Sequence, residues 1–402
     1  MHILMFADQH IETLGGAQVS MRLQRRFLER AGHTVTIVAP ARHGPRATTA
    51  TPDAAFLDLP SVPITLDREY ALTVPGRRAD AAIDRALTHR PPVDVVHVQA
   101  DFWGAFLGHR FSRRTGIPAV HTMHNRVDVG IEAVAPFPGT VLAALNLWQR
   151  RSLPRLSGVP VGSDGWAYLR GLAAGALAVT APSAHFARRL EDHRVFPSVD
   201  VVWNGIDDDV LDAALAVAGA PRTSGRPRFV WLGRMSPEKR LMPFLEAVAA
   251  SGVQADVEVI GGGAQLAAAR SLVQRLQPAA SVTFAGRLPY AETLRRIQEA
   301  DAVVQTSIGF ETQGMTVFEA ASLGTPSVVS DPDIGAELRS GFWAVGERDG
   351  DPSVAALAAA LRRAAEDISG GAAPVPDVSI RERFRQSSRT DAMLEVYRRA
   401  IG

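Results

Sequence analysis

The sequence predicts an α/β protein of two doubly wound domains, and three observations lead to this prediction. Short apolar runs alternate with segments of helical periodicity along most of the chain, a pattern typical of parallel sheets covered by helices. The alternation forms two series, separated by a stretch rich in Gly, Pro, Ser and Arg at residues 219–228. A chain of 402 residues is also longer than one hydrophobic core usually organises.

The first series starts with an apolar strand at residues 3–7. A helix follows over residues 17–30, because apolar residues recur there at helical spacing, and a second strand covers residues 34–39. Further strands are expected at 93–98, 119–122, 176–180 and 199–203, with a helix at 104–113. A strand, a helix and a second strand in this order begin a Rossmann-like sheet.

The second series repeats the pattern after the linker. Strands are expected at 229–232, 257–260, 282–284, 302–305 and 327–330, and helices at 316–323, 354–365 and 380–401. We therefore predict an N-terminal domain (1–205), a linker (206–228), a C-terminal domain (229–380) and a C-terminal helix (381–402) that packs back on the N-terminal domain. The two Rossmann-like domains are expected to face each other across a cleft.

Composition excludes several classes of protein. The net charge of +1 gives no basic surface for nucleic acid, so no nucleic-acid partner is predicted. The absence of cysteine excludes disulfides, thiolate metal sites and a cysteine nucleophile. The N-terminus has no signal-peptide pattern, and no run of about 18 apolar residues could span a bilayer. The expected location is the cytoplasm.

The stretch from Gly309 to Asp331, GFETQGMTVFEAASLGTPSVVSD, carries the strongest chemical signal. Its predicted helix begins near Gly314, and the free N–H groups and dipole of a helix N-terminus favour an anion. Glu311 lies in the preceding loop and Glu319 in the helix, so the two carboxylates suit hydroxyls at two ends of a ligand. The alternative is a helix capped by a polar loop, with both glutamates solvated.

A basic turn, GRMSPEKR, follows the first strand of the second series. Arg234 can bind a phosphate with its planar fork, and Lys239 can supply a compact charge. Lys239 is the only lysine in the chain, although arginine was the common choice elsewhere. Pro237 suits the first turn of the following helix. A solvated strand–helix loop is an equally good explanation of this turn taken alone.

Weaker signals come from glycines, histidines and paired aspartates. Gly15 and Gly16 open the first helix, and Gly262 lies in a glycine run after a strand, but neither place has a complete G-x-G-x-x-G dinucleotide fingerprint. His121 suits a sugar hydroxyl better than a metal, and His124 reads as a surface loop residue. The Asp-x-Asp pairs at 207/209, 331/333 and 349/351 lie in turn-rich loops, so no metal is predicted.

Together these segments resemble the retaining glycosyltransferases of family four, which have the GT-B fold. The resemblance spans nearly the whole chain. It depends on five stretches in the expected order: GGAQVSMRLQRRFLERAGHTVTIVAP, AVHTMHN, TAPSAHFARRL with WNGID, GRMSPEKR, and the segment from Glu311 to Glu319. ETQG and VHTMHN further resemble the diacylglycerol glucosyltransferase branch, although NRVDVG stands where that branch often has a tyrosine-rich stretch.

The resemblance implies a role for each candidate site residue. Arg234 and Lys239 would bind the donor diphosphate, and the amides of Gly314, Met315 and Thr316 its distal phosphate or sugar. The other implied contacts are Glu311 and His121 with the donor sugar, Glu319 with the ribose, Arg287 and Leu288 with the base, and Gly15, Gly16 and Gly262 along the donor. No metal and no cofactor is implied, because the nucleoside-diphosphate sugar is a co-substrate.

The implied reaction transfers a hexose from a sugar nucleotide to a lipid or glycan acceptor and forms an α-glycoside. UDP-glucose and GDP-mannose both fit the resemblance as donors, and UDP-glucose is the one preferred. A lipid acceptor would bring the chain to the inner face of the cell membrane. The segment from Phe137 to Arg155, with Trp148 beside arginines, suits a peripheral membrane contact or an ordinary core helix equally.

Three other functions share parts of the pattern. A GT-B-type sugar-nucleotide epimerase would have the same fold and donor but no acceptor. A non-catalytic protein would bind the sugar nucleotide without transferring the sugar. A nicotinamide dehydrogenase would share the doubly wound sheets, but the missing dinucleotide fingerprint argues against it.

Overall fold

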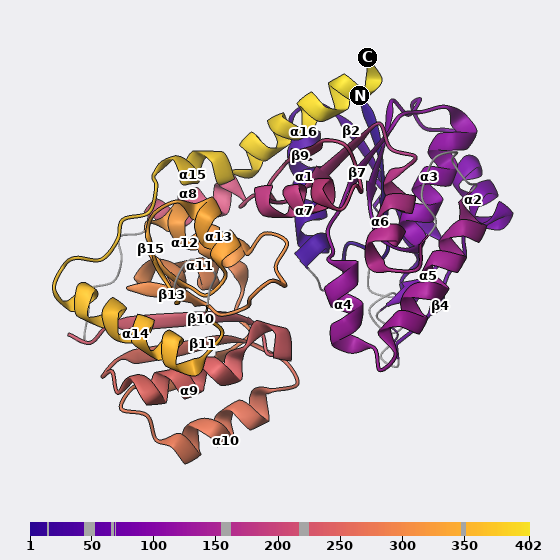
Figure 1. The fold of residues 1–402 in the computed structure, drawn as a ribbon. Coiled ribbons are helices and arrows are strands. Elements are labelled where there is room, and N and C mark those ends of the chain that lie inside the picture. The colour runs from indigo at the N-terminus through magenta and orange to yellow at the C-terminus, as the bar shows by residue number, and fades with distance from the viewer. Residues whose placement is uncertain are drawn as a thin grey trace. The chain divides into compact units, whose positions relative to one another are not determined.

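The computed structural model describes residues 1–13, 16–43, 53–65, 68, 70–153, 162–216, 225–346 and 351–402. The chain folds into two compact units, one of residues 1–205 with 386–402 and the other of residues 206–385 (Figure 1). Each unit is built on a parallel sheet with helices packed against it. The predicted α/β class with two Rossmann-like domains is therefore confirmed.

The first unit contains a seven-stranded parallel sheet in the order β3-β2-β1-β6-β7-β8-β9. Its strands are β1 (His2–Ala7), β2 (Thr34–Pro40), β3 (Phe56–Leu59), β6 (Val95–Gln99), β7 (Ala119–Thr122), β8 (Ala178–Ala181) and β9 (Val199–Val201). A small antiparallel pair, β4 (Val62–Pro63) and β5 (Ala71–Leu72), lies outside it. The chain builds outward from β1 to β3 and then in the other direction from β6, so the strand order reverses between β1 and β6.

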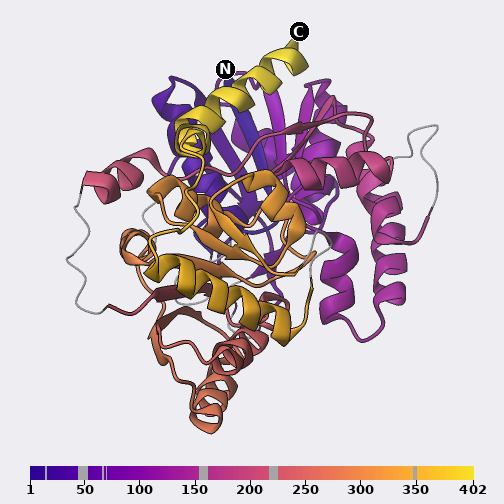
Figure 2. The same ribbon diagram turned by 60° about the vertical axis from the view of Figure 1, so that its left-hand side comes forward.

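The helices of the first unit cover two apolar faces of this sheet. They are α1 (Gly16–Arg30), α2 (Arg77–Leu87), α3 (Trp103–Thr115), α4 (Val127–Val134), α5 (Pro138–Ser152), α6 (Gly165–Ala173), α7 (Ala184–Asp192) and α16 (Gln386–Ile401). Alternation along β1 explains the two faces, because Leu4 and Phe6 join one core and Ile3 and Met5 join the other. α16 contributes to the second core, and both ribbon views place its end beside the N-terminus (Figures 1 and 2).

The second unit contains a six-stranded parallel sheet in the order β12-β11-β10-β13-β14-β15. Its strands are β10 (Arg228–Arg234), β11 (Asp256–Gly262), β12 (Ser281–Gly286), β13 (Ala302–Gln305), β14 (Ser327–Val329) and β15 (Phe342–Ala344). Its helices are α8 (Asp208–Ala216), α9 (Leu241–Ser251), α10 (Leu266–Leu276), α11 (Tyr290–Glu299), α12 (Met315–Leu323), α13 (Pro332–Leu338), α14 (Val354–Ser369) and α15 (Ser379–Phe384). α9 packs on α10 and α14, whereas α11 packs on α12 and α8.

Two boundaries of the predicted organisation are wrong. The range 206–228 is not all linker, because α8 forms within it: Asp207 accepts a hydrogen bond from the Asp209 amide, and Leu211 is buried. The expected single helix over 380–401 is two helices, because Arg385 is extended at ψ 141° between α15 and α16. α15 belongs to the second unit and α16 to the first.

Candidate active site

The second unit has its strand-order reversal between β10 and β13. From β10 the chain adds β11 and β12 on one side, and it then returns to build β13, β14 and β15 on the other. In open parallel sheets, ligands bind in the crevice beyond the carboxyl ends of the strands at such a switch point. β10 ends at Arg234, and β13 leads into the loop that contains Glu311, so both predicted motifs lie at this crevice.

The basic turn after β10 is held in a single defined conformation. Residues Pro237–Lys239 form one 3₁₀ turn, and Arg240 then adopts a left-handed φ of 54° before α9 begins. Pro237 opens this 3₁₀ turn, as a proline at a helix start was expected to do, and Arg240 separates the turn from α9. The Arg240 guanidinium donates to the Thr306 carbonyl oxygen (3.3 Å), and Thr306 Oγ1 donates to the Lys239 carbonyl oxygen (2.6 Å).

These backbone contacts bring the single lysine against the loop after β13. The Lys239 ammonium donates to Glu311 Oε1 and lies 5.8 Å from the centroid of the Phe310 ring. Ser307 Oγ donates to the same carboxylate oxygen (2.7 Å). The Lys239 and Glu311 side chains are 24% and 18% exposed, so the pair remains accessible to a ligand. The basic turn and the acidic loop thus contact each other at the carboxyl ends of β10 and β13.

Arg234 lies at the exposed rim of the same crevice. Its side chain is 68% exposed, and its guanidinium pairs with Glu238 at 3.0 Å. An exposed ion pair of this kind contributes little to stability, so its rearrangement around a phosphate would cost little.

The N-terminus of α12 supplies backbone donors beside the ion pair. Gly314 caps the helix at φ 77°, and a Cβ there would come within 2.6 Å of Ile334 Cδ1. The approach loop is fixed at its other end, because the Gly309 amide donates to Asp331 Oδ2 (2.7 Å). The first amides of a helix have no partner within the helix, so those of Met315 and Thr316 can bind an anion.

Glu319 lies deeper in α12 and is not solvated. The residue is 5% exposed and accepts a hydrogen bond from the Tyr290 hydroxyl at 2.8 Å. Burial raises the pKa of this carboxyl. The interpretation that both glutamates are solvated is therefore wrong for Glu319.

The remaining predicted residues of the second unit line the ends of β11 and β12. Gly262 ends β11 and accepts from the Met235 amide at 2.9 Å, and a Cβ on it would come within 3.3 Å of Arg287 Nε. Leu288 packs against the buried Val230 and Ile260 cluster. These contacts bring Gly262, Arg287 and the basic turn together at one edge of the sheet.

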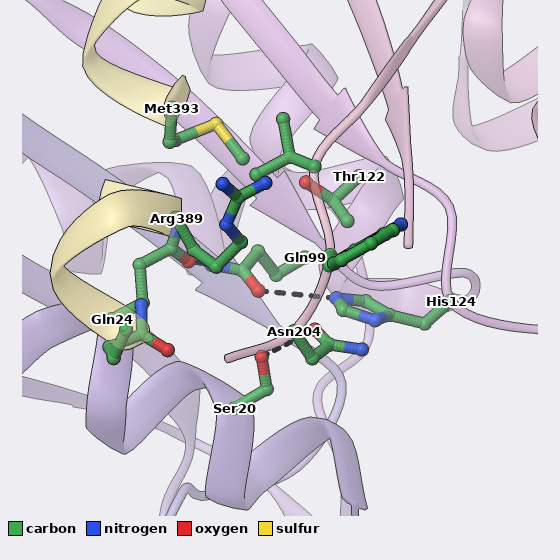
Figure 3. Close-up of a pocket in the computed structure, with 11 residues that line it drawn as sticks. Ser20, Gln24, Gln99, Thr122, His124, Asn204, Arg389 and Met393 are labelled. Carbon is green, nitrogen blue, oxygen red and sulfur yellow. Dashed lines mark hydrogen bonds between the residues drawn. The ribbon is translucent and has the colours of Figure 1, made fainter. Parts of the chain in front are cut away.

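The first unit contains a separate polar pocket, drawn in Figure 3. Its lining includes Ser20 and Gln24 from α1, Gln99 from β6, His124 after β7, Asn204 after β9, and Gln386, Arg389 and Met393 from α16. His124 Nε2 donates to Gln99 Oε1 (3.1 Å), and Ser20 Oγ donates to Asn204 Oδ1 (2.6 Å), as the dashed lines show. Burial lowers the pKa of His124 to about 4, so its ring is neutral at pH 7.

The sequence of each unit matches a known family model. The model described as Glycosyltransferase Family 4 matches residues 14–210, and the one described as Glycosyl transferases group 1 matches residues 218–367. The chain belongs to glycosyltransferase family 4. Its fold is therefore GT-B, as predicted.

Three relatives of this glycosyltransferase illustrate the family. It is 25% identical to an alpha-monoglucosyldiacylglycerol synthase of Streptococcus pneumoniae over 82% of this chain and 70% of the relative. It is also 25% identical to a GDP-mannose-dependent alpha-mannosyltransferase of Mycolicibacterium smegmatis over 85% of this chain and 84% of that relative. The crystal structure of Anabaena HepE in complex with UDP and glucose superimposes with a TM-score of 0.64 at 15% identity, covering 99% of this chain and 100% of that one. The first relative places the glycosyltransferase near the diacylglycerol glucosyltransferase branch.

The structure does not support the predicted role of His121. The side chain is fully buried, His121 Nε2 donates to the Ala100 carbonyl oxygen (2.9 Å), and His121 Nδ1 lies 3.0 Å from His109 Nε2. Both ring nitrogens are therefore engaged inside the domain core, because the residue is the third of a strand whose four side chains are all buried. His124, which the sequence suggested was a surface residue, is the histidine that lines a pocket.

Other predicted and missed residues of the first unit can also be placed. Gly16 is the first residue of α1, and Gly15 lies outside the described residues. The pocket residues Gln99, His124 and Asn204 were missed as candidates, although AVHTMHN and WNGID were already singled out by resemblance. The feature of the sequence that could have identified them is their position directly at or after the carboxyl ends of β6, β7 and β9.

The paired aspartates act as turn and cap residues where the structure describes them. Asp207, Asp331 and Asp351 each accept from the amide two residues along the chain, at 3.1, 3.0 and 2.8 Å. Asp349 lies outside the described residues. Among the described residues there is no group of three or more His, Asp or Glu side chains suited to a metal ion. None of the helices that the structure describes is long and apolar enough to cross a bilayer.

Two carboxyls, Asp8 partly buried and Asp101 buried, lie at the switch point of the first sheet. Asp8, after β1, accepts from the amides of Asp101 and Gly104 (both 2.8 Å) at the start of α3. Asp101, after β6, is fully buried; Asn125 donates to its Oδ2 (2.5 Å), and its Oδ1 has no hydrogen-bond partner. Burial and the neighbouring Asp8 raise the pKa of Asp101 to about 8.

Asp101→Asn is expected to stabilise the protein more at pH 8.5 than at pH 5. A carboxyl whose pKa is about 8 when folded and 3.8 when unfolded binds a proton only in the folded state between those values. The free energy of unfolding therefore falls as pH rises through that window, and asparagine removes this loss. Thermal unfolding at pH 5 and pH 8.5 tests it. A difference in Tm between variant and wild type that is equal at both pH values would show that Asp101 does not titrate in this way.

Proposed function

We propose that this glycosyltransferase moves a hexose from a nucleoside-diphosphate sugar to a lipid or glycan acceptor, with retention and formation of an α-glycoside. The observation that carries the proposal is the Lys239–Glu311 ion pair at the β10/β13 switch point. It brings an ammonium and a carboxylate together at the carboxyl ends of two strands, in the loop that leads to the N-terminal amides of α12. A sugar diphosphate needs these three groups, since it presents phosphate oxygens beside sugar hydroxyls.

The proposed chemistry stabilises the leaving diphosphate without a metal ion. Negative charge develops on the leaving diphosphate as the glycosidic bond breaks, and fixed donors aimed at that charge lower the barrier. Lys239, Arg234 and the amides of Met315 and Thr316 are the donors in this proposal. When a diphosphate binds Lys239, the Glu311 carboxylate can exchange its ammonium donor for a sugar hydroxyl while Ser307 Oγ still donates to Oε1.

The relatives support a choice of donor and acceptor class. One is named for a glycolipid product, another for GDP-mannose, and the Anabaena structure holds UDP and glucose. We propose a diacylglycerol-type lipid as the acceptor and UDP-glucose as the first donor to test, ahead of GDP-mannose. The enzyme would then act at the cytoplasmic face of the cell membrane.

A thermal-shift panel of UDP-, GDP- and ADP-sugars tests the donor class. A ligand that binds only the folded state stabilises it by mass action, so sugar nucleotides of one base should give a clear rise in Tm. At a hundredfold excess of ligand over Kd, the free energy of unfolding increases by about 2.7 kcal/mol. The same donor with lipid acceptors should give an α-glycoside that mass spectrometry and NMR identify. A donor converted to its epimer without acceptor, or binding with no transfer to any acceptor, would contradict the proposal.

The proposed membrane contact is assigned to one face of α5. Phe137, just before the helix, is 73% exposed and Leu147 is 44% exposed, and Ala144 and Arg151 lie on the same exposed stripe. Trp148, by contrast, packs edge-to-face on Phe106 with centroids 5.2 Å apart and is partly buried against the core. An apolar stripe that ends in arginine suits an anionic lipid surface.

Replacing both Phe137 and Leu147 by Asp is expected to reduce co-sedimentation with phosphatidylglycerol vesicles at least fivefold. The two added charges repel an anionic surface, and the lost side chains remove the apolar contact. Leu276→Asp is the matched control, because Leu276 is 37% exposed on α10 of the other unit. Equal vesicle binding by the double variant and the wild type would exclude this face as the contact.

A further inference from the structure

The Glu319 carboxylate has fewer hydrogen-bond donors than its burial requires. It is 5% exposed, and within the described part of the chain the Tyr290 hydroxyl is the donor that it has, through Oε1. A buried carboxylate with one donor is costly, so native structures normally supply more. Oε2 therefore has capacity for donors from a ligand, such as sugar hydroxyls.

Tyr290 is well placed to control how that carboxylate faces a ligand. It is the first residue of α11 and follows Arg287, Leu288 and Pro289 at the carboxyl end of β12, where the base is expected. The residue is 37% exposed, so its ring borders solvent while its hydroxyl reaches the buried Glu319. Burial raises the pKa of the Tyr290 phenol most, and the negative charges of Glu319 and Asp207 raise it further, to well above the usual value. The phenol therefore keeps its proton and remains a hydrogen-bond donor.

We propose that Tyr290 is a positioning and specificity residue for the nucleoside part of the donor. Its hydroxyl holds Glu319 Oε1, which turns Oε2 toward the ribose so that the enzyme distinguishes a ribonucleotide from its deoxy analogue. The proposal rests on the proposed function, because it assumes that a nucleoside diphosphate binds this crevice. It adds a residue on a neighbouring helix as the cause of ribose selectivity.

The energetic argument concerns the direction of the carboxylate. A free glutamate side chain rotates about its last bond, and fixing that rotation before binding removes an entropic cost from the complex. A hydrogen bond from a ribose hydroxyl to a charged, preoriented oxygen is stronger than one to a mobile or protonated group. Without the Tyr290 hydroxyl, the buried carboxyl has no donor, and its neutral form is favoured further.

The test compares the affinity of the enzyme for UDP and for 2′-deoxy-UDP by calorimetry, or for the matching pair of the base that the thermal-shift panel selects. Wild type should bind the ribonucleotide at least tenfold more tightly, since a site that pairs a hydroxyl rejects a ligand lacking it. Tyr290→Phe should reduce this ratio at least fivefold. Thr293→Ala, on the same helix, removes a hydroxyl that bonds the Pro289 carbonyl and should leave the ratio unchanged.

A second comparison separates a positioning role from simple loss of structure. In a Glu319→Gln background, Tyr290→Phe should change the ratio less than twofold, because the group that it orients is gone. A Tyr290→Phe enzyme that binds UDP but keeps the wild-type ratio would overturn the inference and leave the proposed function intact. Failure of the wild type to bind any nucleoside diphosphate would overturn both.

Discussion

Lys239→Ala is expected to lower kcat for glycosyl transfer by about 10²-fold or more, by analogy with the loss of one oxyanion donor. Lys239 is the less exposed of the two cations in this site. Its ammonium pairs with Glu311, and its carbonyl oxygen accepts a hydrogen bond from Thr306 Oγ1. Its removal takes one positive charge from the site of the leaving diphosphate, and Arg234, which in the proposal already donates from an exposed position, cannot also take the place of Lys239. Steady-state kinetics with the donor identified by the thermal-shift panel measure the effect.

Arg275→Ala is the matched control for this variant. It removes one positive charge from the same unit, at an exposed position of α10. Both variants should keep Tm within a few degrees of wild type, because a partly exposed ion pair contributes about 1 kcal/mol or less. Lys239→Arg should restore only part of the activity, since a planar guanidinium does not reproduce a compact ammonium. Turnover by Lys239→Ala within threefold of wild type would remove this residue from the mechanism.

Gly314→Ala is expected to reduce activity at least tenfold. Its φ of 77° costs an L residue about 1–2 kcal/mol, and the added Cβ would meet Ile334 Cδ1 at 2.6 Å. Ile334 is fully buried, so we expect relief of that contact to displace the N-terminus of α12 and its Met315 and Thr316 amides as well as the Ile334 side chain. A misplacement of about 1 Å can cost 10²-fold in rate. The measurement is kcat and KM for the donor, together with Tm.

Gly324→Ala provides an unusually close control at the other end of the same helix. Gly324 has φ 86°, and an added Cβ would meet nothing within 4 Å. Both variants carry the same backbone strain, but only Gly314→Ala adds the contact with Ile334, at the N-terminal end of α12. Equal losses of activity in the two variants would show that the effect comes from helix stability and not from the position of the amides.

The fold was largely predictable because the pattern that encodes it is local. Buried parallel strands appear as short apolar runs, and the helices between them have their own periodicity, so β1, β10 and β13 were each located within one or two residues. α8 and the break at Arg385 were not located. α8 is short and follows a turn, and Arg385 is extended for a tertiary reason, its pairing with Ile206.

The candidate site was predictable in part. The motifs around Lys239 and Glu311 stand out by residue type and by position after a strand. Burial was harder to predict, because His121 and His124 are three residues apart and share one motif, yet His121 is fully buried and His124 lines the pocket of Figure 3. Tyr290 gave no signal at all, since its partner Glu319 is on another helix.

Local patterns in the sequence were enough to predict the two parallel sheets, the family, and the charged and glycine-rich turns after strands, because strand and helix periodicity act over a few neighbours. Which of these turns meet could be seen only in the folded chain: the strand order places β10 beside β13, and that adjacency brings Lys239 to Glu311 across 72 positions of the chain. Side-chain pairing and burial depend on packing between distant segments, which no local pattern specifies.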